Sequence, residues 1–321
     1  MRIATRHGEL AVSRSGEGQP LLLLHGLPGS AASWAQVRDR LGPGTDVLTP
    51  DLLGFGASAK PLFLSSLHAV GQAEALLDVL DALALPSVTV VGHDFGGPVA
   101  VSLLALAPER VSGLGLLATN TFPDAPVPFP LSTVTWPLVG HLAARTLFSR
   151  PSLRLMLLAG VGSPRVRLDP HAALGDHAQV RCIRTVFAAS LRRLEELYRP
   201  VQQALQSCDV EGFVLWGERD PFFSVQQGRR TADAFGARFT ALEGAGHFLP
   251  DERPAEVAEA IRERRRRPPR RGPGQEPPAV QPSRPPRTVH ARAVSRTAPS
   301  ASAGRASRSA SRSAALPSSS S

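Results

Sequence analysis

The 321-residue sequence is poor in cysteine and in long apolar runs, and each shortage narrows what the protein can be. Its two cysteines, Cys182 and Cys208, are too few for a disulfide framework and lack the spacing of metal ligands. No apolar run approaches the roughly 18 residues that cross a bilayer, and residues 1–15 lack the apolar core of a signal peptide. We therefore expect a soluble, cytoplasmic protein without a metal site or a membrane partner.

Acidic residues are almost absent from the end of the chain. Residues 264–321 hold 13 Arg, 10 Pro, 12 Ser, one acidic residue and no aromatic residue, which gives them a formal charge of +12 against −3 for residues 1–263. Such a composition buries too little apolar surface to offset the entropy of ordering. We expect a disordered tail, which is either an electrostatic arm for nucleic acid or acidic membranes or a solvated extension. The folded body is acidic, so we do not expect it to bind nucleic acid.

Short apolar runs alternate with helical patterns along residues 1–263. Runs such as 20–24 are apolar at nearly every position, which is typical of strands buried on both faces. Strands that alternate with helices indicate a mostly parallel sheet covered by helices on both faces, an α/β fold. One predicted helix carries Val70, Ala73, Leu77, Leu80 and Ala84 on one face. The sequence predicts strands at residues 2–7 and 9–14 with Gly8 at the turn between them, and at 20–24, 45–49, 87–91, 114–118, 213–216 and 238–242.

The alternation of strands and helices stops between residues 121 and 206. That segment has no strand-like run, contains several prolines, and shows helical patterns such as residues 180–198. We interpret it as a helical cap that is inserted between two parts of an α/β core, residues 1–120 and 207–263.

A glycine-rich turn follows the strand predicted at residues 87–91. The segment Gly92-His93-Asp94-Phe95-Gly96 has the G-x-nucleophile-x-G form of a nucleophile elbow. Small flanking residues in such an elbow allow a strained turn that exposes the central side chain. Asp94 holds the central position, so a carboxylate is the candidate nucleophile.

A second loop supplies a partner for this elbow. Residues 25–27 follow the buried strand predicted at 20–24, so the backbone amide of Leu27 can point to the same place as that of Phe95. Two amides beside the start of a helix form a site for a developing oxyanion. Leu27 and Phe95 are therefore the expected oxyanion hole.

An acid and a histidine follow the last two predicted strands. Asp220 lies just past residues 213–216, and His247 lies just past residues 238–242. We prefer Asp220 as the acid over its neighbour Glu218, and over Asn120 and Asp124, which follow an earlier strand. The two other histidines near the elbow, His25 and His93, are expected to support loops.

Together these motifs resemble the α/β-hydrolase superfamily, in which the chain order is nucleophile, acid, histidine. The resemblance covers residues 2–264, and residues 51–58 are similar to a loop of the branch that contains epoxide hydrolases and haloalkane dehalogenases. An aspartate in the elbow is also similar to that branch. This resemblance implies that Asp94 attacks an sp3 carbon and forms an alkyl-enzyme ester. It also implies that His247 activates the water that hydrolyses the ester, and that Asp220 orients the imidazole of His247.

Stabilisation of the leaving group separates the two activities of this branch. Epoxide hydrolases of the family typically use two cap tyrosines, and this chain has one tyrosine, Tyr198, which either donates a proton or merely packs the cap. Haloalkane dehalogenases usually have a tryptophan after the nucleophile, where this chain has Phe95. Trp136, the one tryptophan of the expected cap, either donates to a halide or packs in the cap.

The sequence favours an epoxide hydrolase over a haloalkane dehalogenase because of Tyr198. A carboxylic-ester hydrolase is a further alternative, and so is a non-catalytic protein of the same fold that binds a ligand or takes part in signalling. The expected partners are a small apolar substrate and water, with no cofactor, and the chain is expected to be a monomer or a homodimer.

Overall fold

The computed structural model describes residues 1–127, 129–164 and 166–266. Eight strands form one sheet in the order β1-β2-β4-β3-β5-β6-β7-β8. The first three neighbouring strands pair antiparallel, and from β4 to β8 all neighbours pair in parallel. The strands are β1 (Arg2–Thr5), β2 (Gly8–Ser15), β3 (Pro20–Leu24), β4 (Asp46–Pro50), β5 (Val88–His93), β6 (Val111–Leu117), β7 (Gly212–Gly217) and β8 (Arg238–Leu242). The predicted α/β fold class is confirmed, and each predicted strand is present.

The first hairpin differs from its prediction in one detail. Gly8 is not in the turn, because it is the first residue of β2 and pairs with Thr5 of β1. The turn consists of Arg6 and His7. Gly8 has a φ of +130°, a conformation that is easily adopted only by glycine, and this lets β2 leave the turn.

The apolar runs of the central strands result from burial on both faces. Leu21 and Leu23 of β3 pack with α1 (Ala35–Leu41) and α12 (Pro254–Arg266) in one apolar cluster, whereas Leu22 and Leu24 pack in a second cluster on the other face. The second cluster includes α3 (Ala69–Ala82) and α4 (Gly96–Leu106). Alternate side chains of one strand thus enter two cores, so every position must be apolar.

The buried face of α3 is rotated from the predicted one. Ala73 and Leu80 are buried as expected, but Val70 is exposed and Ala84 lies beyond the end of the helix. Leu76 and Val79 complete the buried face. The remaining core elements are η1 (Ala31–Trp34), α2 (Leu64–Leu67), η2 (Pro108–Arg110), α10 (Val225–Ala234) and α11 (Leu249–Glu252).

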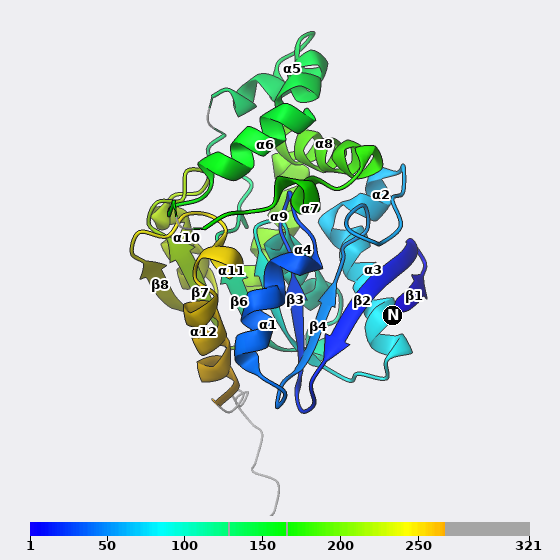
Figure 1. Ribbon diagram of the computed structural model, residues 1–321, viewed down its shortest axis with the longest axis vertical. Coiled ribbons are helices and arrows are strands. Elements are labelled where there is room, and N and C mark those ends of the chain that lie inside the picture. Colours follow the sequence, from blue (N-terminus) through cyan, green and yellow to red (C-terminus); the bar gives the residue numbers. More distant parts are fainter. Residues whose placement is uncertain (128, 165, 267–321) are drawn as a thin grey trace, which may run out of the picture. The chain divides into compact units, whose positions relative to one another are not determined.

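Between β6 and β7 the described residues form helices and no strand. In Figure 1, α5, α6 and α8 form a cover at one end of the sheet, while α1 and α12 lie in front of the sheet. The pattern predicted at residues 180–198 is divided between two helices, α8 and α9, which meet at Arg193. Helix α9 packs along α4 and thereby returns the chain to the core. The segments are η3 (Leu131–Thr135), α5 (Gly140–Leu147), α6 (Arg150–Ala159), α7 (Pro170–Leu174), α8 (His177–Arg192) and α9 (Leu194–Ser207).

Helix α12 continues past the residue at which the tail was expected to begin. Arg264 is buried, and its guanidinium donates hydrogen bonds to the backbone oxygens of Glu211 and Ser112. Residues 264–266 thus form the end of α12, and the remainder of the expected tail, residues 267–321, lies outside the described residues. None of the helices in the described part of the chain is long and apolar enough to span a membrane.

Candidate active site

Asp94 lies in a sharp turn between β5 and α4. Its φ of +49° is unusual for a residue with a side chain, and its flanking glycines explain how the turn is formed. A Cβ on Gly92 would lie 2.2 Å from the carbonyl oxygen of Gly96, and a Cβ on Gly96 would lie 2.4 Å from that of Leu24. Only glycine fits at these two positions, so the chain can turn tightly and present the carboxylate of Asp94 above the end of the sheet.

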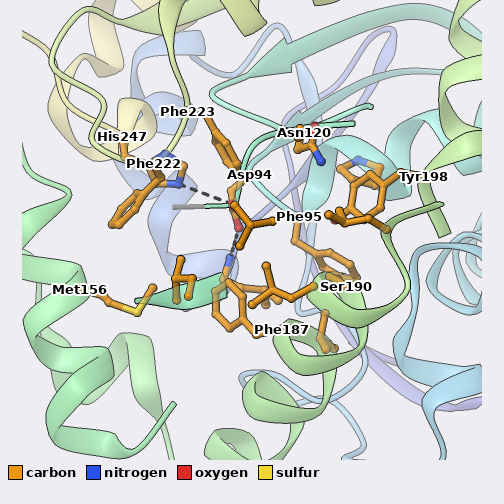
Figure 2. Close-up of a pocket in the computed structure, with 18 of the residues that line it drawn as sticks. Asp94, Phe95, Asn120, Met156, Phe187, Ser190, Tyr198, Phe222, Phe223 and His247 are labelled. Carbon is orange, nitrogen blue, oxygen red and sulfur yellow. Dashed lines mark hydrogen bonds and ion pairs between the residues drawn. The ribbon is translucent and has the colours of Figure 1, made fainter. Parts of the chain in front are cut away.

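Two groups contact the two carboxylate oxygens of Asp94 from different sides. The backbone amide of Leu27 donates a hydrogen bond of 2.7 Å to Oδ2. The imidazole Nε2 of His247 lies 3.6 Å from Oδ1. The dashed lines in Figure 2 mark both contacts of the Asp94 carboxylate, one of which runs to His247. Phe95, the other expected oxyanion donor, is the N-cap residue directly before α4, so its amide lies at the N-terminal end of that helix.

Asp220 holds the other nitrogen of His247. Its Oδ2 accepts a hydrogen bond of 2.9 Å from Nδ1, and its Oδ1 accepts the backbone amides of Phe222 and Phe223. The Asp220 side chain is fully buried, whereas Glu218 is exposed. The structure therefore brings the three predicted residues Asp94, His247 and Asp220 into one row.

The charges in this row stabilise one another. Burial disfavours a charge on His247, but the two carboxylates of Asp220 and Asp94 outweigh it and raise its pKa to about 10. Burial likewise disfavours a charge on Asp94, but the imidazole of His247 and the amide of Leu27 outweigh it and lower its pKa. The resting site is thus an ion pair between the Asp94 carboxylate and the His247 imidazolium.

His93 and His25, the two other histidines near the elbow, are buried and neutral. Burial and the charge of His247 lower the pKa of His93 to about 4, and burial also lowers the pKa of His25. The Nε2–H of His93 donates to the carbonyl oxygen of His247 at 2.9 Å. The Nδ1 of His25 donates to the carbonyl oxygen of Gly26, and its Nε2 accepts the amide of Leu52. Both rings fix loops of the site.

The other candidate acids have structural partners. The side chain of Asn120 lines the pocket described below, but its amide group donates to and accepts from the backbone of Phe122. Asp124 forms an ion pair with Arg230 at 2.8 Å on the surface. Within the described residues neither side chain forms a hydrogen bond with His247, whereas that of Asp220 does.

A mainly apolar pocket opens above Asp94, between the sheet and the cap (Figure 2). It encloses about 1000 Å³, including the open space at its mouth. The sequence did not predict its apolar walls, because residues from the cap and from the segments that follow five strands of the sheet come together only in the folded chain. The lining comprises Leu27, Pro28, Asp94, Phe95, Pro98, Asn120, Ala125, Pro126, Val127, Leu131, Met156, Val186, Phe187, Ser190, Leu191, Leu194, Tyr198, Phe222, Phe223, His247 and Phe248.

The structure brings Tyr198 to this pocket and leaves Trp136 outside it. Burial raises the pKa of Tyr198 to about 12, and the negative charge of Asp94 adds to this rise. A hydrogen bond with Ser190 acts in the opposite direction and lowers the pKa. Tyr198 thus keeps its proton at neutral pH. Trp136 is 54% exposed and is not among the lining residues, so it neither donates to a leaving group in the pocket nor packs in the core of the cap.

A family model described as alpha/beta hydrolase fold matches residues 19–149, which extend from β3 through the elbow into the cap. Together with the eight-stranded, mostly parallel sheet, this match shows that the chain has the α/β-hydrolase fold. This α/β hydrolase shows, within the described residues, no cluster of three or more His, Cys, Asp or Glu side chains that could hold a metal ion.

Proteins similar to this α/β hydrolase have different names and activities. It is 28% identical to 2-hydroxymuconate semialdehyde hydrolase of Pseudomonas sp., over 77% of this chain and 87% of that protein. It is 25% identical to Epoxide hydrolase A of Mycobacterium tuberculosis, over 81% of this chain and 95% of that protein. Its structure aligns with the epoxide hydrolase CorEH at a TM-score of 0.64 and 22% identity, over 82% of this chain and 96% of that one, which shows the shared fold.

Proposed function

We propose that this α/β hydrolase opens small apolar epoxides, using Asp94 as a nucleophile and passing through an alkyl-enzyme ester. The observation that carries the proposal is the carboxylate in the elbow, with Oδ2 bound to the amide of Leu27 and Oδ1 turned to His247. A carboxylate that attacks an sp3 carbon forms a stable ester, whereas attack on a carbonyl carbon would give an energetic anhydride. The apolar pocket suits a substrate of low polarity.

In the first step, Oδ1 of Asp94 attacks a ring carbon of the epoxide. A bond forms between that oxygen and the carbon, the ring bond from the carbon to oxygen breaks, and the alkoxide takes the proton of the Tyr198 hydroxyl. Esterification removes the negative charge of Asp94, which is one of the two charges that raise the pKa of His247. The imidazolium then gives up its proton, by way of water, to the Tyr198 phenolate.

In the second step, the neutral imidazole of His247 takes a proton from water, and the hydroxide attacks the carboxyl carbon of Asp94. The negative charge develops on Oδ2, which the amide of Leu27 already contacts, and the amide of Phe95 is the second donor. The ester bond breaks, and the departing alkoxide takes the proton of the added hydroxyl. The diol leaves, and the carboxylate and the imidazolium are restored.

The lining of the pocket favours an epoxide over a haloalkane. A departing halide requires N–H donors, but Phe95 has none in its side chain and Trp136 is not among the lining residues. The Nδ2 of Asn120 already donates to the backbone of Phe122. Tyr198, in contrast, supplies a protonated hydroxyl, which an epoxide oxygen needs.

The test is a single turnover in water labelled with ¹⁸O. A panel of epoxides, haloalkanes and p-nitrophenyl esters first identifies a substrate that the protein turns over. If Asp94 is the nucleophile, the label appears in the peptide that contains Asp94, and the first product molecule carries an unlabelled oxygen from the enzyme. Label in the product alone, with an unlabelled peptide, would show that Asp94 acts as a general base and would overturn the proposal.

A further inference from the structure

The outer edge of the cap carries large apolar side chains that have no cover in the structure. They lie within 14 residues of one another, around η3 and the start of α5. Figure 1 draws α5 at the top of the cap. Monomeric proteins rarely expose large apolar side chains in such a group without a binding role. We call this group the cap tip, and its members are Phe129, Trp136, Leu138, Val139 and Leu142.

Leu138 is the least expected member of the cap tip. Its side chain is fully exposed, and its backbone has a φ of +66° in the left-handed region. A leucine in that region is strained, and packing within the chain does not compensate for the strain because the side chain touches solvent on every side. A strained and exposed apolar residue is best explained by a contact outside the chain.

Charge on the cap identifies the kind of contact. Residues 125–168 contain five arginines, one histidine and no acidic residue. Arg145 is exposed on α5, three residues after Leu142, so the two side chains lie on the same side of the helix. Arg154 of α6 and Arg167 are exposed as well. Residues 125–168 of the cap thus combine exposed apolar side chains with positive charge and have no acidic side chain of their own.

We propose that the cap tip docks on the surface of an anionic lipid bilayer. Its apolar side chains would enter the interface and its arginines would face lipid phosphates, as in helices that lie on a membrane. Tryptophan favours this interface because its ring is amphipathic. A second copy of the chain is a poorer partner, because a symmetric contact would bring the same positive charges together.

This surface contact differs from the sequence expectation that no membrane partner exists, since that expectation rested on the lack of a spanning segment. It also brings the pocket close to the bilayer. Leu131 of η3 lines the pocket, and Trp136 of the cap tip follows that short helix directly. If the proposed function holds, apolar substrates that are concentrated in the bilayer lie close to the cap wall. The docking itself does not depend on that function.

The natural tryptophans make the docking measurable. Trp34 and Trp216 are fully buried, and Trp136 is 54% exposed, so quenching by brominated lipid chains reports on the cap tip alone. We expect the full chain at 0.15 M salt to bind phosphatidylglycerol-containing vesicles with a blue shift and strong quenching of Trp136. We expect much weaker binding to vesicles of phosphatidylcholine alone.

Substitutions then separate the cap tip from the arginine-rich end of the chain, which also attracts anions. The double variant Leu138→Asp, Leu142→Asp should lose about tenfold or more in vesicle partitioning, because two aliphatic side chains no longer leave water. The matched control Leu106→Asp changes an exposed leucine at the far end of α4 and should partition like the unchanged chain.

Three results would overturn the proposal. The first is binding without quenching of Trp136, which would assign the binding to another part of the chain. The second is equal partitioning of the double variant and the control. The third is a dimer in sedimentation equilibrium that the double variant dissociates, because the cap tip would then be an interface between copies. Quenching in the unchanged chain remains decisive even if the double variant fails to fold, which its thermal unfolding would reveal.

Discussion

The carboxylate of Asp94 should raise the pKa of His247, and Asp94→Asn should lower it. The two groups are 3.6 Å apart, at Oδ1 and Nε2. Coulomb's law gives about 1 kcal/mol for two unit charges at that distance in water and about 5 kcal/mol at an effective dielectric constant of 20. Since one pKa unit corresponds to about 1.4 kcal/mol, the substitution should lower the pKa of His247 by about one to three units from its value of about 10.

The assay is an NMR titration of the histidine Cε1–H signals, in which His247→Gln identifies the signal of His247. Asp124→Asn is the matched control, because it removes a surface carboxylate that is paired with Arg230. The control should leave the pKa of His247 unchanged. A shift of less than about half a unit in Asp94→Asn, or an equal shift in both variants, would refute the coupling. The same fall in pKa is what makes His247 a base in the ester, so hydrolysis of the ester should quicken as pH rises through the lowered value.

Three further predictions concern the ester, the proton donor and the end of the chain. In His247→Gln, Asp94 should still attack the substrate, but the ester should not be hydrolysed, and intact-protein mass spectrometry would detect it as a stable adduct. If this variant forms no adduct with a substrate that the unchanged protein turns over, the two-step scheme is contradicted. Tyr198→Phe keeps the ring but removes the proton donor, so formation of the ester from an epoxide should slow by about 10²–10⁴-fold in rapid-mixing experiments, and an unchanged rate would exclude this role. Ending the chain after residue 266 should leave the melting temperature unchanged. Ending it after residue 263 removes the two hydrogen bonds of Arg264 and should lower the free energy of unfolding by about 3–6 kcal/mol. Equal stabilities of the two truncated chains would show that Arg264 contributes nothing.

The sheet and the row of site residues could be predicted from the sequence because their signals are local. A strand buried on both faces, such as β3, requires apolar residues at every position, and this pattern is visible in five residues. The elbow is equally compact, since the glycines that form the turn adjoin Asp94. Asp220 and His247 were predicted from their positions after strands, and the structure places them within hydrogen-bonding distance of each other.

Features that depend on packing between distant segments were harder to predict. The start of the tail was misplaced by three residues because Arg264 counts as a tail residue by composition, yet its guanidinium fits over Gly113, where a Cβ would lie 2.8 Å from it. Trp136 was assigned two roles, and the structure supports neither, because the direction of a cap side chain depends on how the helices of the cap pack. The rotation of α3 about its axis, which exposes Val70, is likewise set by its neighbours.

In the elbow, the glycines are required by the space around them, whereas Asp94 is not. Backbone oxygens lie so close to Gly92 and Gly96 that a side chain at either position would displace β3 or the start of α4. Gly26 is constrained in the same way, since a Cβ there would lie 2.5 Å from the Cβ of Asp94. The side chain of Asp94 itself lines the pocket. The glycines fix where this side chain lies, but they do not require it to be a carboxylate. Packing therefore does not explain the carboxylate at that point, and its presence there supports our proposal of attack on an sp3 carbon.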